Sequence, residues 1–92
     1  MTVDVKIPTV LRKHTDGAAT VQADGANLRE VIDAVEAKHA GFREQVVGAD
    51  GALHRFINVY INDEDVRYLD GLATVVADGD VVAILPAVAG GA

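Results

Sequence analysis

Residues 81–92, VVAILPAVAGGA, contain the segment on which the arrangement of the other elements depends. Val81–Leu85 is an unbroken apolar run typical of a buried strand, and the Asp-Gly-Asp sequence before it is typical of a turn. Pro86 should end this strand, because proline has no amide hydrogen to donate to a sheet. We therefore expect a folded domain over residues 1–86 and a flexible tail over residues 87–92.

The predicted tail is small and uncharged, and it ends in a Gly-Gly-Ala sequence. At roughly 3.3–3.6 Å per extended residue, the six residues 86–91 would reach about 20 Å. Such a segment is suited to enter a narrow groove and present a carboxylate there. The alternative is a frayed chain end with no function, which is common at termini. The extended segment that leads from the end of the domain to the last glycine consists of Pro86, Ala87, Val88, Ala89 and Gly90.

Alternation of apolar and polar residues predicts further strands upstream of this segment. The pattern appears at Thr2–Ile7, at Ala19–Ala23 and at Arg55–Ile61. A short strand is also expected near Asp65–Tyr68, after an Asn-Asp-Glu turn. Together with the last segment, these runs predict a sheet of four to five strands.

A helical period replaces the alternation between the second and third strands. Apolar residues at i, i+3, i+4 and i+7 predict one main helix over about residues 27–40. Asn27 followed by Glu30 resembles a capping box, and Gly41 stands where a left-handed helix terminus is expected. The next segment, residues 42–51, is ambiguous; it is consistent with a further turn of helix that carries Phe42 and Val46 into the core, followed by a loop.

The order of these elements predicts an α+β fold. One helix covers only one face of a sheet, so the other face should stay open. The first and last strands should lie parallel at the centre, joined by a crossover that contains the helix. This arrangement is the β-grasp, or ubiquitin-like, roll with a mixed sheet.

Composition excludes several classes of partner and site. A net charge of −6 argues against nucleic acid or an anionic membrane surface as partner. The absence of cysteine excludes disulfides, thiolate metal sites and sulfur carried on a side chain. His14, His39 and His54 lack metal-ligand spacing, so we expect no metal and no cofactor. No signal peptide or membrane-spanning run is apparent, so a cytoplasmic location is expected.

Three stretches of the sequence resemble the ubiquitin-like sulfur carriers of the ThiS and MoaD family. They are Ile7–Arg12, Leu53–Arg67 and Asp78–Gly91, and together they make the resemblance extend over nearly the whole chain. Within that family, the sequence is most similar to the carriers that serve cysteine biosynthesis. A diglycine alone would be weak evidence, whereas the three stretches together are strong.

The resemblance implies a carrier rather than an enzyme. In the family, an E1-like adenylating and sulfurtransferase enzyme activates the carboxylate that matches Gly91, and sulfide converts it to a thiocarboxylate. A PLP-dependent cysteine synthase, which works from O-phosphoserine, would then take the sulfur. A metallopeptidase would release the product. The chain needs no catalytic residue of its own.

Ala92 departs from the family pattern, because it follows the second glycine. We expect a peptidase to remove Ala92, so that Gly91 carries the free carboxylate. The alternative is that the chain as written is inactive.

The open face of the sheet is the expected docking surface for these partners. We expect Phe56, Asn58 and Tyr60 on one strand, and Val82 and Ile84 on the last strand, to point away from the helix. The alternative is that a small sheet merely leaves some apolar side chains exposed.

Other functions stay open at this point. The chain could carry sulfur for molybdopterin or thiamine synthesis, or act as a ubiquitin-like protein modifier. An enzyme reading would place a small hydrolytic site at His54 and the acidic turn Asp63–Asp65. That reading leaves the tail unexplained, and so small a domain offers little room for a catalytic pocket.

Overall fold

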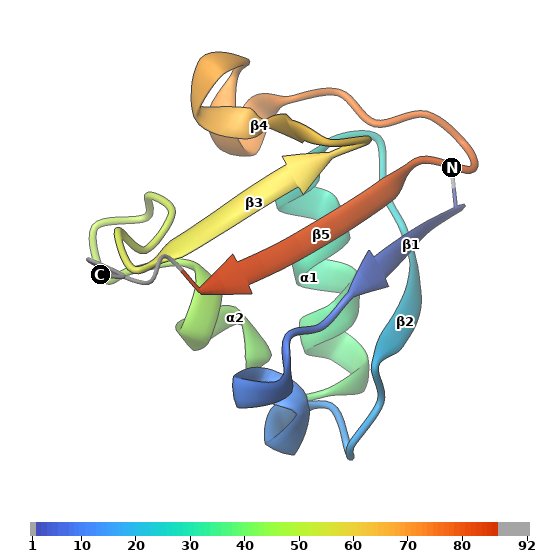
Figure 1. Cartoon of the computed structure of the whole chain (residues 1–92), viewed down its shortest axis with the longest axis vertical. Coiled ribbons are helices and arrows are strands. Elements are labelled where there is room, and N and C mark those ends of the chain that lie inside the picture. The colour runs from blue at the N-terminus through green and yellow to red at the C-terminus, as the bar shows by residue number, and fades with distance from the viewer. Residues whose placement is uncertain (1, 87–92) are drawn as a thin grey trace.

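The computed structural model describes residues 2–86, which form one mixed sheet with helices on one of its faces (Figure 1). The strands are β1 (Thr2–Lys6), β2 (Thr20–Asp24), β3 (Ile57–Ile61), β4 (Glu64–Asp65) and β5 (Val81–Pro86). The α-helices are α1 (Leu28–Lys38) and α2 (Phe42–Val46), and the short 3₁₀ turns are η1 (Thr9–His14), η2 (Val66–Tyr68) and η3 (Gly71–Ala73).

The strand order confirms the predicted β-grasp topology. The sheet runs β2-β1-β5-β3-β4, with β1 and β5 parallel at its centre and the other pairs antiparallel. The crossover from β1 to β5 contains α1, which lies behind the two central strands in Figure 1. The last segment of the chain therefore lies in the middle of the sheet, flanked by β1 and β3.

The core lies between the sheet and the helices. Its strand residues alternate inward, and its helix residues form the stripe that the sequence predicts. The fully buried members include Val3, Val5, Val59, Val82 and Ile84 from the sheet, and Leu28, Val31, Val35, Phe42 and Val46 from the helices. Phe42 and Val46 lie in α2, which settles the ambiguous segment after α1 in favour of a further turn of helix.

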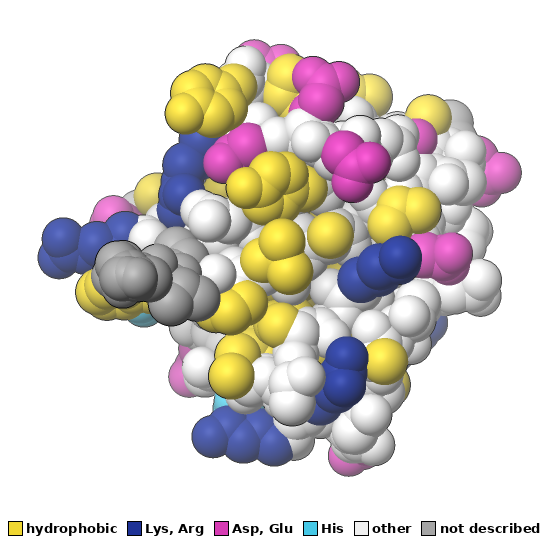
Figure 2. Space-filling model, viewed as in Figure 1, with side chains coloured by type: hydrophobic (Ala, Val, Ile, Leu, Met, Phe, Trp, Pro, Cys, Tyr) yellow, Lys and Arg dark blue, Asp and Glu magenta, His cyan; other side chains and the backbone are white. Residues whose placement is uncertain are grey.

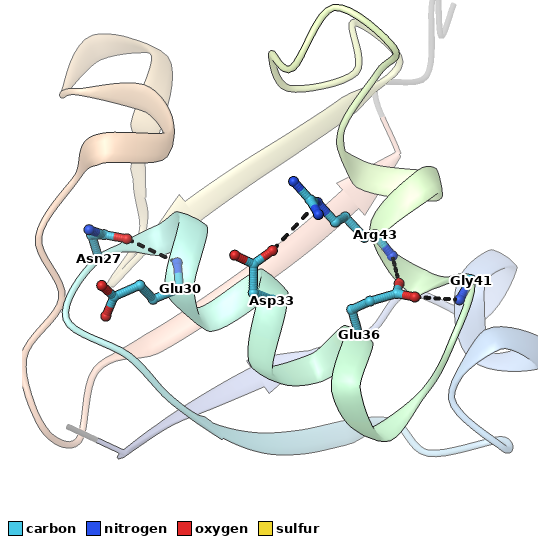
Figure 3. A network of polar contacts seen from close by, with 6 residues as sticks. All are labelled: Asn27, Glu30, Asp33, Glu36, Gly41 and Arg43. Carbon is cyan, nitrogen blue, oxygen red and sulfur yellow. Dashed lines mark hydrogen bonds and ion pairs between the residues drawn. The ribbon is translucent and has the colours of Figure 1, made fainter.

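The start of α1 is capped by side chains (Figure 3). The Asn27 Oδ1 accepts the amide hydrogen of Glu30 at 2.9 Å, as the capping-box pattern predicts. The Glu30 carboxylate reaches one residue further back than in the standard box, because it accepts from the amide of Ala26 at 2.9 Å. Two of the amide groups near the helix start thereby have partners.

The end of α1 is joined to α2 by one carboxylate (Figure 3). Glu36 accepts from the backbone amides of Arg43 at 2.8 Å and Gly41 at 3.1 Å, and these bonds lower the pKa of Glu36. Gly41 has φ of +97°, the left-handed conformation expected there. An ion pair of 3.4 Å between Arg43 and Asp33 also links the two helices.

The segment after β3 differs from the prediction of a short strand near Asp65–Tyr68. Asn62 and Asp63 both adopt positive φ, which makes a tight turn and starts β4 at Glu64. The Asp65 side chain then accepts the amide of Arg67 at 2.9 Å, which favours a 3₁₀ turn over a continued strand.

The outer strand β2 has one main-chain carbonyl covered by a cation. The Ile7 amide donates to the Ala19 carbonyl at 2.8 Å. The main-chain N–H and C=O groups of odd-numbered β2 residues therefore point towards β1, and those of even-numbered residues point outward from the sheet edge. Gln22 is one of the outward residues, and the Lys38 ammonium, from the last turn of α1, donates to its carbonyl at 2.9 Å.

Within residues 2–86, none of the helices has the length and hydrophobicity required for a membrane span.

Candidate functional site

The sheet face opposite α1 is uncovered within the described part of the chain, and it carries an apolar centre. Figure 2 shows this face, with hydrophobic side chains gathered over β3 and β5. Tyr60 is paired with Ala83, and Asn58 with Leu85. Residues paired across antiparallel strands share one face, so these four side chains form two neighbouring rows. Leu85 is 47% exposed, and the other three are half-buried.

The predicted orientation of Val82 and Ile84 is wrong. Their exposed fractions are 0% and 1%, and they point into the core beneath α1. The register explains this, because Ile84 pairs with the buried Val59 and therefore lies on the inner face with it. The outward residues of the last strand are Ala83 and Leu85, which the sequence reasoning did not select.

Phe56, Asn58 and Tyr60 are accessible, as their predicted outward orientation requires, and their role in docking stays a prediction. Phe56 lies just before β3 and is 56% exposed. Its ring lies 5.7 Å from the ring of His54, between centroids, and the Arg55 guanidinium carbon lies 5.7 Å from its centroid. An exposed aromatic residue with a cation beside it therefore lies at the start of β3.

Charges of opposite sign border the apolar centre. In Figure 2 acidic side chains gather towards β4, and basic side chains gather towards η1. Asp63 and Glu64 are exposed in the β3–β4 turn. At the other end, Lys6 is the exposed neighbour of Ala83, and Lys13 lies in η1. A partner that binds across this face would meet an acidic and a basic border on opposite sides.

Arg67 connects η2 to the beginning of β3. Its guanidinium donates to the carbonyl oxygens of Ile57 at 2.7 Å and His54 at 3.3 Å, and it also donates to the Asn58 Oδ1. An arginine that follows an acidic turn is most simply expected to pair with a carboxylate at the surface. In the described structure its side chain is instead bonded to a loop and a strand that belong to the open face.

Asp80 holds the start of β5 in place. Its carboxylate accepts the Ala77 amide at 2.8 Å and the Asn62 side-chain amide at 2.9 Å, and these bonds lower the pKa of Asp80. The Asn62 Oδ1 accepts in turn from the Val81 amide at 3.0 Å. The two side chains therefore anchor the first residue of β5 to the β3–β4 turn.

The other end of β5 runs one residue further than predicted. Pro86 is the last residue of β5 and lies opposite Ile57. The Asn62 amide donates to the Val81 carbonyl at 2.9 Å, so the pair of Ile57 and Pro86 falls at a non-hydrogen-bonded position of the ladder. A residue at this position donates no amide hydrogen to β3, so proline can occupy it without the loss of a hydrogen bond between β3 and β5.

The tail itself, residues 87–92, lies outside the described residues, and with it Gly90, Gly91 and Ala92. A shallow groove of about 420 Å³ adjoins the last described residue, between the ends of β1 and β5. Leu85 and Pro86 line one side of it, and Lys6 and Arg12 supply its cations. The point at which the chain leaves the sheet is therefore next to the apolar centre and to positive charge.

The described residues offer little support for a hydrolytic centre. The acidic turn pairs with the end of β3, whereas His54 precedes its beginning, so the strand separates the two. No group of three or more histidine, aspartate or glutamate side chains suited to a metal occurs within residues 2–86. The enzyme reading therefore has no assembled site in this part of the molecule.

Comparison with known proteins identifies the relatives of this chain. A model described as "ThiS family" matches residues 5–91. The sulfur carrier protein CysO of Mycobacterium tuberculosis is 55% identical over 93 residues, covering 99% of this chain and 100% of that protein. A crystal structure of the Amycolatopsis orientalis BexX/CysO complex matches with a TM-score of 0.89 at 55% identity, over 92% of this chain and 94% of that one.

A more distant relative belongs to the protein modifiers. The small archaeal modifier protein 3 of Haloferax volcanii is 38% identical over 68 residues, covering 74% of this chain and 73% of that protein.

Proposed function

The chain belongs to the ThiS family of sulfur carriers, and on this premise we propose that it carries sulfur as a thiocarboxylate at Gly91. It is a carrier protein and not an enzyme, like the relatives named CysO. The observation that carries the proposal is the extent of the family match, which continues beyond the folded strands to residue 91. The fold supports it, because β5 leads from the centre of the sheet directly into that segment.

The proposed chemistry requires no side chain of this protein. A carboxylate oxygen of Gly91 attacks the α-phosphate of ATP, and pyrophosphate leaves. Sulfide then attacks the acyl carbon, and AMP departs with the bridging oxygen, so that a C–S bond replaces a C–O bond. Glycine suits both steps, because a β-carbon would hinder the approach of the nucleotide and of the nucleophile.

The partners follow from the relatives and from the open face. We infer that an E1-like adenylating and sulfurtransferase enzyme activates the tail while it docks on the apolar centre formed by Tyr60, Ala83 and Leu85. The relatives named CysO favour cysteine as the product, with a PLP-dependent cysteine synthase acting on O-phosphoserine as sulfur acceptor and a metallopeptidase as the releasing enzyme. The Amycolatopsis complex shows that a relative binds a protein partner, which supports docking here.

We propose further that Ala92 is removed before activation. Two forms of the chain should be compared, one ending at Ala92 and one ending at Gly91. Each is incubated with ATP, sulfide and an E1-like enzyme that thiocarboxylates the mycobacterial carrier. The mycobacterial carrier itself serves as the positive control. We expect sulfur-for-oxygen exchange, seen by mass spectrometry of the intact chain, only in the form that ends at Gly91.

Two outcomes would contradict these proposals separately. Exchange at the carboxylate of Ala92 itself would refute the need for trimming. No exchange in either form, with the positive control active, would refute the carrier function at Gly91. A variant lacking residues 90–92 is the matched negative control, since it keeps every described residue.

The archaeal modifier relative favours protein conjugation as a second candidate. A modifier forms an isopeptide bond to a lysine of another protein and so appears as a ladder of higher-mass bands. Immunoblotting of the tagged chain in its host separates the two, because a sulfur carrier returns to its original mass after each cycle.

A further inference from the structure

Arg67 lies outside the apolar centre, yet three of its hydrogen bonds end on the segment that leads into that centre. We propose that Arg67 is a positioning residue: it fixes residues 54–58 so that the Asn58 side-chain amide donates to a hydrogen-bond acceptor of the protein partner. The inference rests on the proposed function, because it concerns the surface on which the activating enzyme docks.

The Ile57 carbonyl points away from the neighbouring strand β5. The Asn62 amide donates to the Val81 carbonyl, which shows that the main-chain N–H and C=O groups of even-numbered β3 residues point towards β5. The main-chain groups of odd-numbered residues point the other way, so the Ile57 carbonyl points to the side of β3 away from β5. β4 is only two residues long and pairs with Tyr60 and Ile61, at the other end of β3. Within the described residues, the Arg67 guanidinium takes the place of a strand partner for this carbonyl, at 2.7 Å.

The Arg67 side chain donates to three acceptors at the start of β3. The same guanidinium also donates to the His54 carbonyl at 3.3 Å and to the Asn58 Oδ1. A planar fork with five N–H donors can serve three acceptors in fixed directions, whereas a lysine ammonium is a single point. The entry to β3 therefore depends on arginine in particular, and with it the position of Phe56, which lies between the bonded residues.

The hydrogen bond from Arg67 fixes which way the Asn58 side-chain amide is oriented. A guanidinium has no acceptor, so the group of Asn58 that faces it must be the Oδ1. The Nδ2 makes no hydrogen bond within residues 2–86, although Asn58 is half-buried and neighbours Leu85 on the open face. A half-buried amide donor beside an apolar centre matches an acceptor on a partner, either a main-chain carbonyl or a carboxylate, because binding would otherwise bury it unpaired.

The test uses the full carrier ending at Gly91 and the activating enzyme already described. ATP–pyrophosphate exchange gives KM and kcat for the carrier as substrate. The variants Arg67→Ala and Arg67→Lys should each raise KM by roughly tenfold, which is near the upper end of the effect of losing one hydrogen bond between neutral groups, and leave kcat unchanged. Arg29→Ala is the matched control, because Arg29 is exposed on α1 and makes no hydrogen bond or ion pair within residues 2–86.

A second series locates the effect at Asn58. Asn58→Ala should raise KM to a similar extent, and the double variant Asn58→Ala with Arg67→Ala should be no worse than Arg67→Ala alone. Asn58→Asp should also raise KM, since it keeps an acceptor for Arg67 but removes the amide donor. Thermal unfolding of each variant shows which variants are folded at the assay temperature. If Arg67→Ala is unfolded at that temperature, the KM of Arg67→Lys is used for the test instead.

The outcomes separate the two hypotheses. If the unaltered carrier is not adenylated, the proposed function fails. If it is adenylated and a folded Arg67→Lys keeps the original KM, the positioning role fails while the function stands. Additive effects of the Asn58 and Arg67 changes would mean that Arg67 contacts the partner by itself, and this too would overturn the proposal.

Discussion

Replacing Ile84 with alanine should destabilise the domain far more than the same replacement at its neighbour Leu85. Ile84 is 1% exposed and pairs with the buried Val59, whereas Leu85 is 47% exposed on the open face. The two residues are adjacent and similar in size, so the comparison isolates the face of the sheet on which each lies.

The magnitudes follow from burial. Truncating a buried isoleucine to alanine costs about 2–5 kcal/mol of unfolding free energy. Full burial of a leucine stabilises by about 1.5–3 kcal/mol, so truncation of the half-exposed Leu85 should cost about 1 kcal/mol or less. A domain of this size has about 5–15 kcal/mol in total, so Ile84→Ala would remove a large share of it. At about 4–8 °C per kcal/mol, the melting temperature should fall by roughly 8–40 °C.

Urea unfolding followed by far-ultraviolet circular dichroism measures both variants, since the chain has no tryptophan to report by fluorescence. Equal losses of unfolding free energy in the two variants would refute the assignment of faces. The adenylation assay should give the opposite order: Leu85→Ala should raise KM, whereas Ile84→Ala should leave it unchanged at a temperature at which the variant is folded.

Three other changes test separate parts of the structure. Gly25→Ala should cost about 1–3 kcal/mol in urea unfolding, because a β-carbon there would lie 2.7 Å from the backbone nitrogen of Val31; an unchanged midpoint would refute that close approach. Asn27→Ala should cost about 1 kcal/mol, and Asn27→Asp should restore most of it; failure of aspartate to restore it would exclude the capping role. The pKa of Asp80 is lowered from 3.8 in the folded state, so ionised Asp80 should stabilise the fold above pH 3.8, and this contribution should be lost as the pH falls through the folded-state pKa. The unfolding free energies of the wild type and of Asp80→Asn should therefore converge in acid titrations. A gap that is independent of pH would contradict this.

The sequence predicted those elements whose residues alternate or repeat with a helical period. In β3 the polar Asn58 separates buried Ile57 and Val59, so the inner face could be assigned before the structure was seen. In β5 every residue before Pro86 is apolar, and such a run contains no information on which residues face inward. The errors at Val82 and Ile84 arose there, and only the pairing with β3 corrects them.

The role of Arg67 was also beyond sequence reasoning. A surface arginine after an acidic turn is most simply expected to pair with a carboxylate. Its actual acceptors are carbonyls and an amide of residues 54–58, which come within reach only because the β3–β4 turn reverses the chain. Long-range contacts of this kind have no local sequence signal.

The sheet carries a cation on an outward main-chain carbonyl on both sides: on the outer strand β2, and on the part of β3 that the two-residue outer strand β4 does not pair with. Lys38 covers Gln22 on β2, and Arg67 covers Ile57 on β3. An additional strand from another molecule would have to displace these side chains before it could bond to either carbonyl, which is one way in which natural sheets avoid aggregation. We expect these two cations to oppose fibril growth through the edges of the sheet, which leaves the broad face as its accessible surface.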